Sequence, residues 1–113
     1  MNELEFTLKL EEIPVILDGK EYTLRELTGQ QRDAYMDDMN KRMRYVGGKA
    51  EGFTKFEGLQ AGLLAKCLFD SEGKNVSEKT IQMYPSHVVQ ALFAKAQELS
   101  GLNESGAEEV KND

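Results

Sequence analysis

The stretch that decides the fold, ILDGKEYTLRELTGQQRD, runs from Ile16 to Asp33. Asp18-Gly19 between two apolar runs is typical of a two-residue hairpin turn, and on the returning strand Tyr22 and Leu24 are expected to face inward. Thr28 and Gln31 then have capping-box spacing, in which each side chain accepts a hydrogen bond from the other residue's backbone N–H group. A strand pair thus leads directly into a helix, which predicts an α+β domain.

On the N-terminal side of this stretch, residues 3–11 alternate between apolar and polar side chains. Leu4, Phe6, Leu8 and Leu10 fall on one side, with Glu3, Glu5, Thr7, Lys9 and Glu11 on the other. This period of two predicts a half-buried strand. Together with the hairpin of Val15–Leu17 and Glu21–Arg25, it predicts a small antiparallel sheet of three short strands, with an apolar face that helices must cover.

On the C-terminal side, about four helices are predicted. The first begins at the Thr28 capping box and ends at Gly47-Gly48, after which residues 47–52 form a flexible connection. The second begins at a further capping box, Thr54 to Glu57, and is apolar enough to be the central helix. A turn at Asp70–Lys74 follows, then a short helix from Ser77 to about Tyr84 that Pro85 breaks, and a last helix from Ser86 that stops at a left-handed Gly101.

The chain of 113 residues fits a single domain, which we place at residues 1–102. Residues 103–113 lack the apolar side chains that would offset the entropy of ordering, so they are expected to be a disordered acidic tail. A mostly helical α+β domain with a small N-terminal antiparallel sheet is therefore the predicted architecture.

Composition indicates a reduced, aqueous compartment. Cys67 is the only cysteine, so no disulfide can form within the chain. The first residues are acidic where a signal peptide needs basic ones, and no apolar run reaches the length of a membrane span, so we expect the mature chain to start near Met1 and to stay in the cytoplasm. The net charge of −6 disfavours nucleic acid and anionic membranes, and the basic residues Lys41, Arg42 and Arg44 are better explained as the end of the first helix.

The residues that could carry chemistry are few. His87 is the only histidine and lies at a helix start, while Cys67 lies on an apolar helix stripe. One His and one Cys do not make a typical zinc site, Asp33, Asp37 and Asp38 lack the spacing of a calcium loop, and Gly47-Gly48 lacks the context of a phosphate loop. The sequence therefore predicts a non-enzymatic interaction protein that holds no cofactor or metal.

A methionine stripe on the first helix is the best candidate for a partner surface. Unbranched thioether side chains can repack against different partners, although an ordinary core role is the favoured reading for this stripe. The candidate partner-binding residues are Tyr35, Met36, Met39, Met43 and Tyr45.

The order of these parts resembles the tail assembly chaperones of long-tailed bacteriophages. The resemblance rests on residues 16–33, 57–61, 64–70, 84–86, 89–93 and 96–102, together with the acidic tail. It covers the chain from about Leu4 onward. The resemblance depends on all of these stretches occurring in the same order, since no single one of them is a motif specific to the family.

The resemblance implies a protein of the infected host's cytoplasm, absent from the mature virion, encoded by a phage or prophage. Such a protein keeps the tape measure protein soluble and helps gather tail tube subunits around it, in some families through a longer form made by ribosomal frameshifting. Two other functions stay open: a structural head–tail joining component of the virion, and a small acidic regulator or inhibitor that mimics nucleic acid. Oligomeric state, including possible self-association, also stays open.

Overall fold

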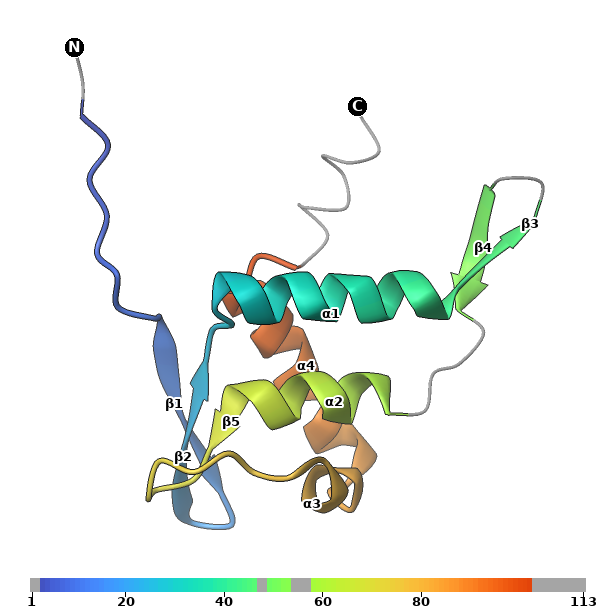
Figure 1. Cartoon of the computed structure of the whole chain (residues 1–113). Helices are drawn as coiled ribbons and strands as arrows, with labels where there is room; N and C mark the ends of the chain where they lie inside the picture. Colours follow the sequence, from blue (N-terminus) through green and yellow to red (C-terminus); the bar gives the residue numbers. More distant parts are fainter. Residues whose placement is uncertain (1–2, 47–48, 54–57, 103–113) are drawn as a thin grey trace.

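The structure is a computed structural model that describes residues 3–46, 49–53 and 58–102. Its elements follow in the order β1 (Glu12–Leu17), β2 (Lys20–Arg25), α1 (Gly29–Arg42), β3 (Met43–Val46), β4 (Lys49–Phe53), α2 (Leu59–Cys67), β5 (Leu68–Phe69), α3 (Glu78–Gln82) and α4 (Ser86–Leu99) (Figure 1). The predicted α+β class is confirmed: a three-stranded antiparallel sheet packs against helices. The predicted tail, residues 103–113, lies outside the described residues.

The hairpin of β1 and β2 forms as the sequence predicts. Leu17 pairs with Lys20 across Asp18 and Gly19, both of which have a positive φ, 51° and 76°. Asp and Gly tolerate this left-handed conformation, which a two-residue turn needs to match the twist of its strands. Leu24 is fully buried and Tyr22 is half-buried, so both face the core as expected.

The third strand of the sheet is not the predicted one. It is β5, which pairs with β2 through Thr23 and Leu24. The Glu26 N–H group donates to the Glu11 carbonyl over 2.9 Å, so the pairing of β1 with β2 extends to Glu11 without a turn. Residues 3–10 therefore run on past the end of β2 and belong to no strand or helix, and the half-buried strand predicted there is wrong.

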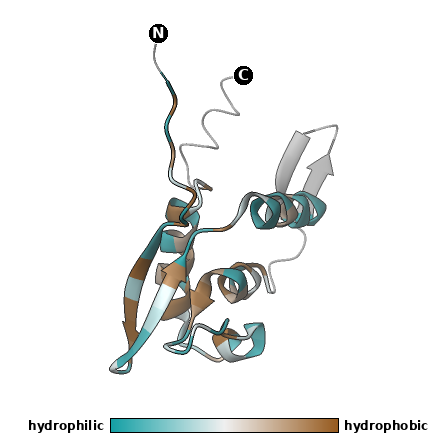
Figure 2. Cartoon of the chain, turned by 60° about the vertical axis from the view of Figure 1, so that its left-hand side comes forward, coloured by the Kyte–Doolittle hydropathy of each residue, from teal (hydrophilic) through white to brown (hydrophobic). Residues whose placement is uncertain are grey.

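The core lies around α2, as predicted. Five of its residues are buried, and it contacts α1, α3, α4 and β2. Figure 2 shows this helix and the adjoining strands as the most hydrophobic part of the chain, whereas α1 is largely hydrophilic. The side chains that complete the core from the other elements are Leu24, Leu27, Tyr35, Leu68, Val76, Ile81, Leu92 and Ala96.

The helix α1 begins as predicted but ends early. The Gln31 N–H group donates to the Thr28 hydroxyl over 3.2 Å, and the Thr28 N–H group donates to the Gln31 side chain over 3.0 Å, which is the capping box. The helix ends at Arg42 instead of continuing to Val46, because residues 43–46 pair with residues 49–53 as a hairpin. Val46 pairs with Lys49, so only Gly47-Gly48 lies between the strands, and the flexible connection predicted for residues 47–52 is wrong.

The helix α2 starts later than predicted. Gly58, expected inside this helix, precedes it and has a left-handed φ of 82°. The second capping box, Thr54 to Glu57, lies outside the described residues. The remaining boundaries agree with prediction: Ser77 caps α3 by accepting from the Thr80 N–H group over 3.2 Å, and Gly101 has a φ of 69°.

Substitution of glycine by alanine is expected to have opposite effects on stability at Gly62 and at Gly58. Gly62 is helical, and a methyl group there would meet only the flexible Glu78 carboxylate at 3.5 Å, so Gly62→Ala is expected to stabilise the fold by about 0.5–1 kcal/mol. Gly58→Ala forces an L side chain into the left-handed region and is expected to destabilise by roughly 1 kcal/mol. Urea unfolding of the two variants measures both, and a loss of stability in Gly62→Ala would contradict the expectation.

Candidate functional site

The predicted partner surface lies on α1 and β3, and the structure separates its members by exposure. Tyr35 is buried, at 2% exposed, and is the buried residue of α1. Met36 is 44% exposed, and Met39 is half-buried against the core. Met43 and Tyr45 belong to β3, so they do not continue the helical stripe.

Tyr35 joins α1 to the rest of the core. Its hydroxyl has no hydrogen-bond partner among the described residues. Burial raises the pKa of Tyr35 from 10.0 to about 12, against a smaller lowering by the nearby Gln97 side chain of α4. A neutral phenol shielded from water is thus part of the packing, whereas its neighbour Met36 is a large apolar side chain of this helix that is exposed.

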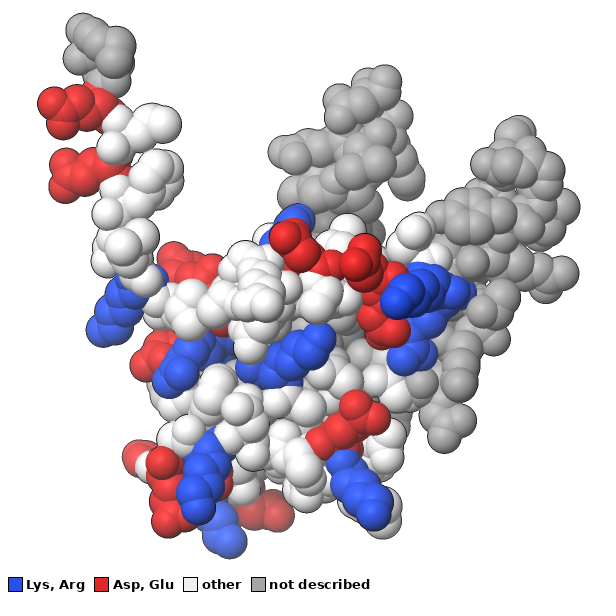
Figure 3. Space-filling view, viewed as in Figure 1, with Lys and Arg blue, Asp and Glu red and all other residues white. Residues whose placement is uncertain are grey.

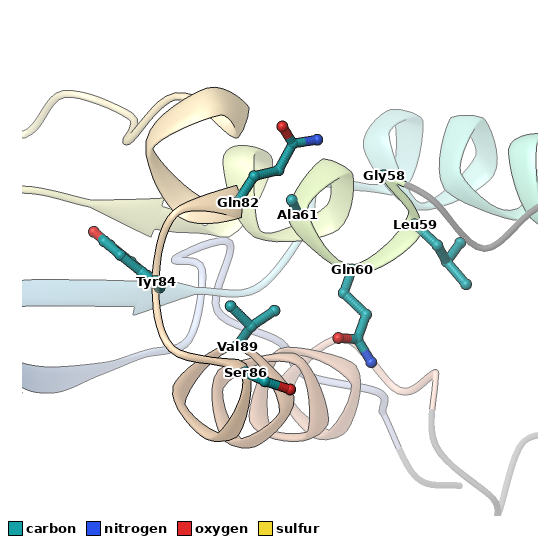
Figure 4. A pocket seen from close by; sticks show the side chains of 8 residues that line it. All are labelled: Gly58, Leu59, Gln60, Ala61, Gln82, Tyr84, Ser86 and Val89. Carbon is teal, nitrogen blue, oxygen red and sulfur yellow. The ribbon is translucent and has the colours of Figure 1, made fainter.

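A second candidate surface is a hollow that the sequence did not predict. It has a volume of about 630 Å³ and lies between α2, the end of α3 and the start of α4. Figure 4 shows Gln60 of α2 pointing toward α4, from which Val89 projects toward α2. The lining residues are Gly58, Leu59, Gln60, Ala61, Gln82, Tyr84, Ser86 and Val89.

Tyr84 also lines a smaller neighbouring hollow of about 260 Å³, which Ile16, Leu17 and Val88 share. The backbone positions Tyr84 firmly, since its N–H group donates to the Ile81 carbonyl over 3.0 Å and Pro85 follows with a φ of −56°. Burial, and then the adjoining Tyr22, raise the pKa of Tyr84. The residue before it in the chain, Met83, is an apolar side chain that is 84% exposed.

The two hollows are lined by amide, hydroxyl and apolar groups and by one carboxylate, that of Asp18. Ser86 accepts a hydrogen bond from Gln90 over 3.0 Å and has no histidine as its partner. Cys67 is fully buried, and burial raises the pKa of its thiol from 9.0 to about 12, so the thiol stays protonated. Within the described ranges no group of three His, Cys, Asp or Glu side chains could hold a metal ion. No helix in the described part of the chain is long and apolar enough to cross a membrane.

Charge is spread over the surface in both signs. Figure 3 shows acidic and basic side chains interspersed on the visible face of the body, with uncharged surface between them. The basic residues Lys41 and Arg42 lie in the last turn of α1, as predicted, and Arg42 pairs with Asp38 over 3.0 Å. Arg44, which was predicted to lie with them at the end of the helix, belongs to β3 instead, because α1 ends at Arg42. No extended basic field of the kind that binds nucleic acid faces the viewer there.

The fold is a small α+β domain in which a three-stranded antiparallel sheet packs against helices. No family model matches the sequence, and no curated protein matches it. Among solved structures, the tail assembly chaperone of bacteriophage HK97 is similar, with a TM-score of 0.53 and 17% sequence identity. The likeness covers 80% of this chain and 85% of that chain. This chain therefore has the fold of a phage tail assembly chaperone, as the resemblance implied.

Proposed function

We propose that this protein is a phage tail assembly chaperone that binds the tape measure protein, keeps it soluble and helps recruit tail tube subunits. The observation that carries the proposal is the shared fold with the HK97 tail assembly chaperone over 80% of the chain. The ordered resemblance of residues 16–33, 57–61, 64–70, 84–86, 89–93 and 96–102 to this family also supports it. Its place of action is the host cytoplasm, and the mature virion lacks it.

The binding surface we propose includes the exposed part of α1 together with β3. Met36 presents a flexible thioether to solvent, and Met39 lies one turn further along the same helix, half-buried. Met43 and Tyr45 follow directly on β3, while Tyr35 supports the surface from beneath. A long helical partner can lay its apolar face on such a surface, and the net charge of −6 keeps copies of a crowded complex apart.

The proposal is tested by co-expressing this chain with the tape measure protein of the same genome. A soluble complex that forms only when this chain is present is the expected result. An insoluble tape measure protein and an unaccompanied chain are the opposite result. Mass spectrometry of purified virions then distinguishes a chaperone, which is absent, from a head–tail joining component, which is present.

Two exposed methionines provide a matched pair of variants for the binding surface. Met36→Glu places a charge on the proposed surface, whereas Met83→Glu makes the same change beside the Tyr84 hollows. Both side chains are exposed, so neither change should lower stability by more than about 0.5 kcal/mol. We expect Met36→Glu to reduce the co-purified tape measure protein at least about tenfold, which corresponds to losing about 1.4 kcal/mol of binding. A loss in Met83→Glu alone would place the surface at the hollows instead.

A further inference from the structure

Residues 3–10 form an extended arm with an unpartnered apolar side. Leu4, Phe6 and Leu8 are 86%, 79% and 98% exposed, although large apolar side chains in such a row are normally buried. Figure 1 shows this arm leaving β1 and running away from the sheet, and at its base Lys9 and Leu10 share a hollow with Leu99 of α4. Figure 3 shows its acidic side chains on one side and uncharged surface on the other.

The arm cannot extend the sheet of its own chain, and the sheet's open edge is poorly suited to receive an arm from another. The Glu11 carbonyl accepts a hydrogen bond from the Glu26 N–H group, so Glu11 and every second residue after it direct their backbone groups toward the paired strand. The residues between them, which are Glu12, Pro14 and Ile16, direct their backbone groups to the open edge of the sheet. Pro14 is one of these residues, and it has no N–H group to offer. The opposite edge, β5, is only two residues long, so an unpaired strand of another chain suits the arm better than either edge of this sheet.

The sequence of the arm complements itself. In an antiparallel pair whose centre is Phe6 opposite Phe6, Leu4 lies opposite Leu8 and Glu3 lies opposite Lys9. Opposed residues project from the same face, so the apolar side chains of both arms gather on one face and the two ion pairs on the other. A parallel pair in register would instead place Glu3, Glu5 and Lys9 each against its own copy. Charge thus favours the antiparallel arrangement.

We propose that the arm of residues 3–9 is a docking strand for a second copy of this chain, which it joins as a two-stranded antiparallel ribbon across a twofold axis at Phe6. Each arm pairs its backbone groups and packs its apolar side chains against those of the other, and the Lys9 N–H group exchanges its present hydrogen bond to the Thr7 hydroxyl, 3.3 Å long, for one across the ribbon. A two-stranded ribbon is only marginally stable in water, so the dimer forms at high protein concentration.

Disulfide trapping in the full-length chain tests the register. In the proposed ribbon the two Phe6 Cα atoms lie about 4.5–5.5 Å apart, within the range of a disulfide, so Phe6→Cys should cross-link into a dimer under mild oxidation. In Leu8→Cys the two new cysteines are four residues apart along the ribbon, about 13 Å, and should not cross-link. Leu4→Cys mixed with Leu8→Cys should cross-link again. The native Cys67 is fully buried and does not interfere.

Charge reversal in solution supplies the second measurement. Glu3→Lys and Lys9→Glu each turn two attractive pairs into repulsive ones and should weaken the dimer about tenfold in sedimentation, while the double variant restores it. Equal cross-linking of Phe6→Cys and Leu8→Cys, or a chain that stays monomeric at all concentrations, overturns the proposal. A third variant, Ile16→Cys, places a thiol on β1 at a position that is 60% exposed. Cross-linking of Ile16→Cys to Phe6→Cys would show that the open sheet edge receives the arm, which also overturns the proposal.

Discussion

Replacing Leu64 with alanine is expected to lower the free energy of unfolding by about 2–5 kcal/mol, a large part of the roughly 5–15 kcal/mol that holds a domain of this size together. Leu64 is 0% exposed and lies on α2, which contacts three other helices and β2. Removing its isobutyl group loses the transfer free energy of the buried atoms. It also leaves a cavity that helices fixed on several sides cannot close.

The matched control is Leu8→Ala, the same chemical change on the arm, where the leucine is 98% exposed. There the expected change is within about 0.5 kcal/mol. Urea unfolding followed by far-UV circular dichroism measures both variants, and the urea midpoint should fall for Leu64→Ala while the slope stays constant. Equal effects of the two substitutions would falsify the assignment of α2 as the centre of the core.

The local parts of the fold could be predicted because their signals are local. Asp18-Gly19 specifies its turn because both residues tolerate a left-handed conformation. Thr28 and Gln31 specify the start of α1 because their side chains accept hydrogen bonds from the backbone N–H groups at that helix end. The third strand of the sheet could not be predicted, because an alternating pattern of apolar and polar residues shows only that a segment can be extended. Whether a neighbour exists depends on the tertiary fold, and here the two residues of β5 occupy that place.

The end of α1 was ambiguous for a different reason. Met43 and Val46 continue the helical spacing, yet Tyr45, Val46 and Phe53 around Gly47-Gly48 also carry a hairpin signal. Gly-Gly between β-branched and aromatic residues was the signal that could have decided it.

The candidate site was predictable only in part. Helical spacing identified a stripe on α1, but adjacent positions on a stripe differ in burial, and the structure buries Tyr35 while exposing Met36. The larger hollow at Tyr84 arises where α2, α3 and α4 meet, and the smaller one where the β1–β2 hairpin meets the start of α4, so no single segment encodes either. The one local hint was Met83, an apolar residue left outside the core beside the Tyr84-Pro85 break.

Alkaline pH is expected to destabilise the protein through two buried groups, Cys67 and Tyr35. Burial raises the pKa of Cys67 from 9.0 to about 12 and that of Tyr35 from 10.0 to about 12. Above its ordinary pKa each group loses its proton in the unfolded chain but keeps it in the folded one, so the stability is fully present below pH 9 and falls as the pH rises toward 12. The loss is about 1.4 kcal/mol per pH unit for each group, or roughly 4 kcal/mol at pH 11.

Two variants separate the contributions of Cys67 and Tyr35 to the loss of stability. Subtracting the free energy of unfolding of each variant from that of the parent chain cancels the titration of every other group. Tyr35→Phe removes a hydroxyl that has no hydrogen-bond partner among the described residues, so it should be nearly neutral at pH 7 and flatten the stability curve above pH 10. Cys67→Ala opens a small cavity but should flatten the curve from pH 9 upward. Urea midpoints measured from pH 7 to 11 give both curves. If the parent chain and both variants lose stability in parallel, these two side chains are accessible to solvent, and the core is not closed around α2.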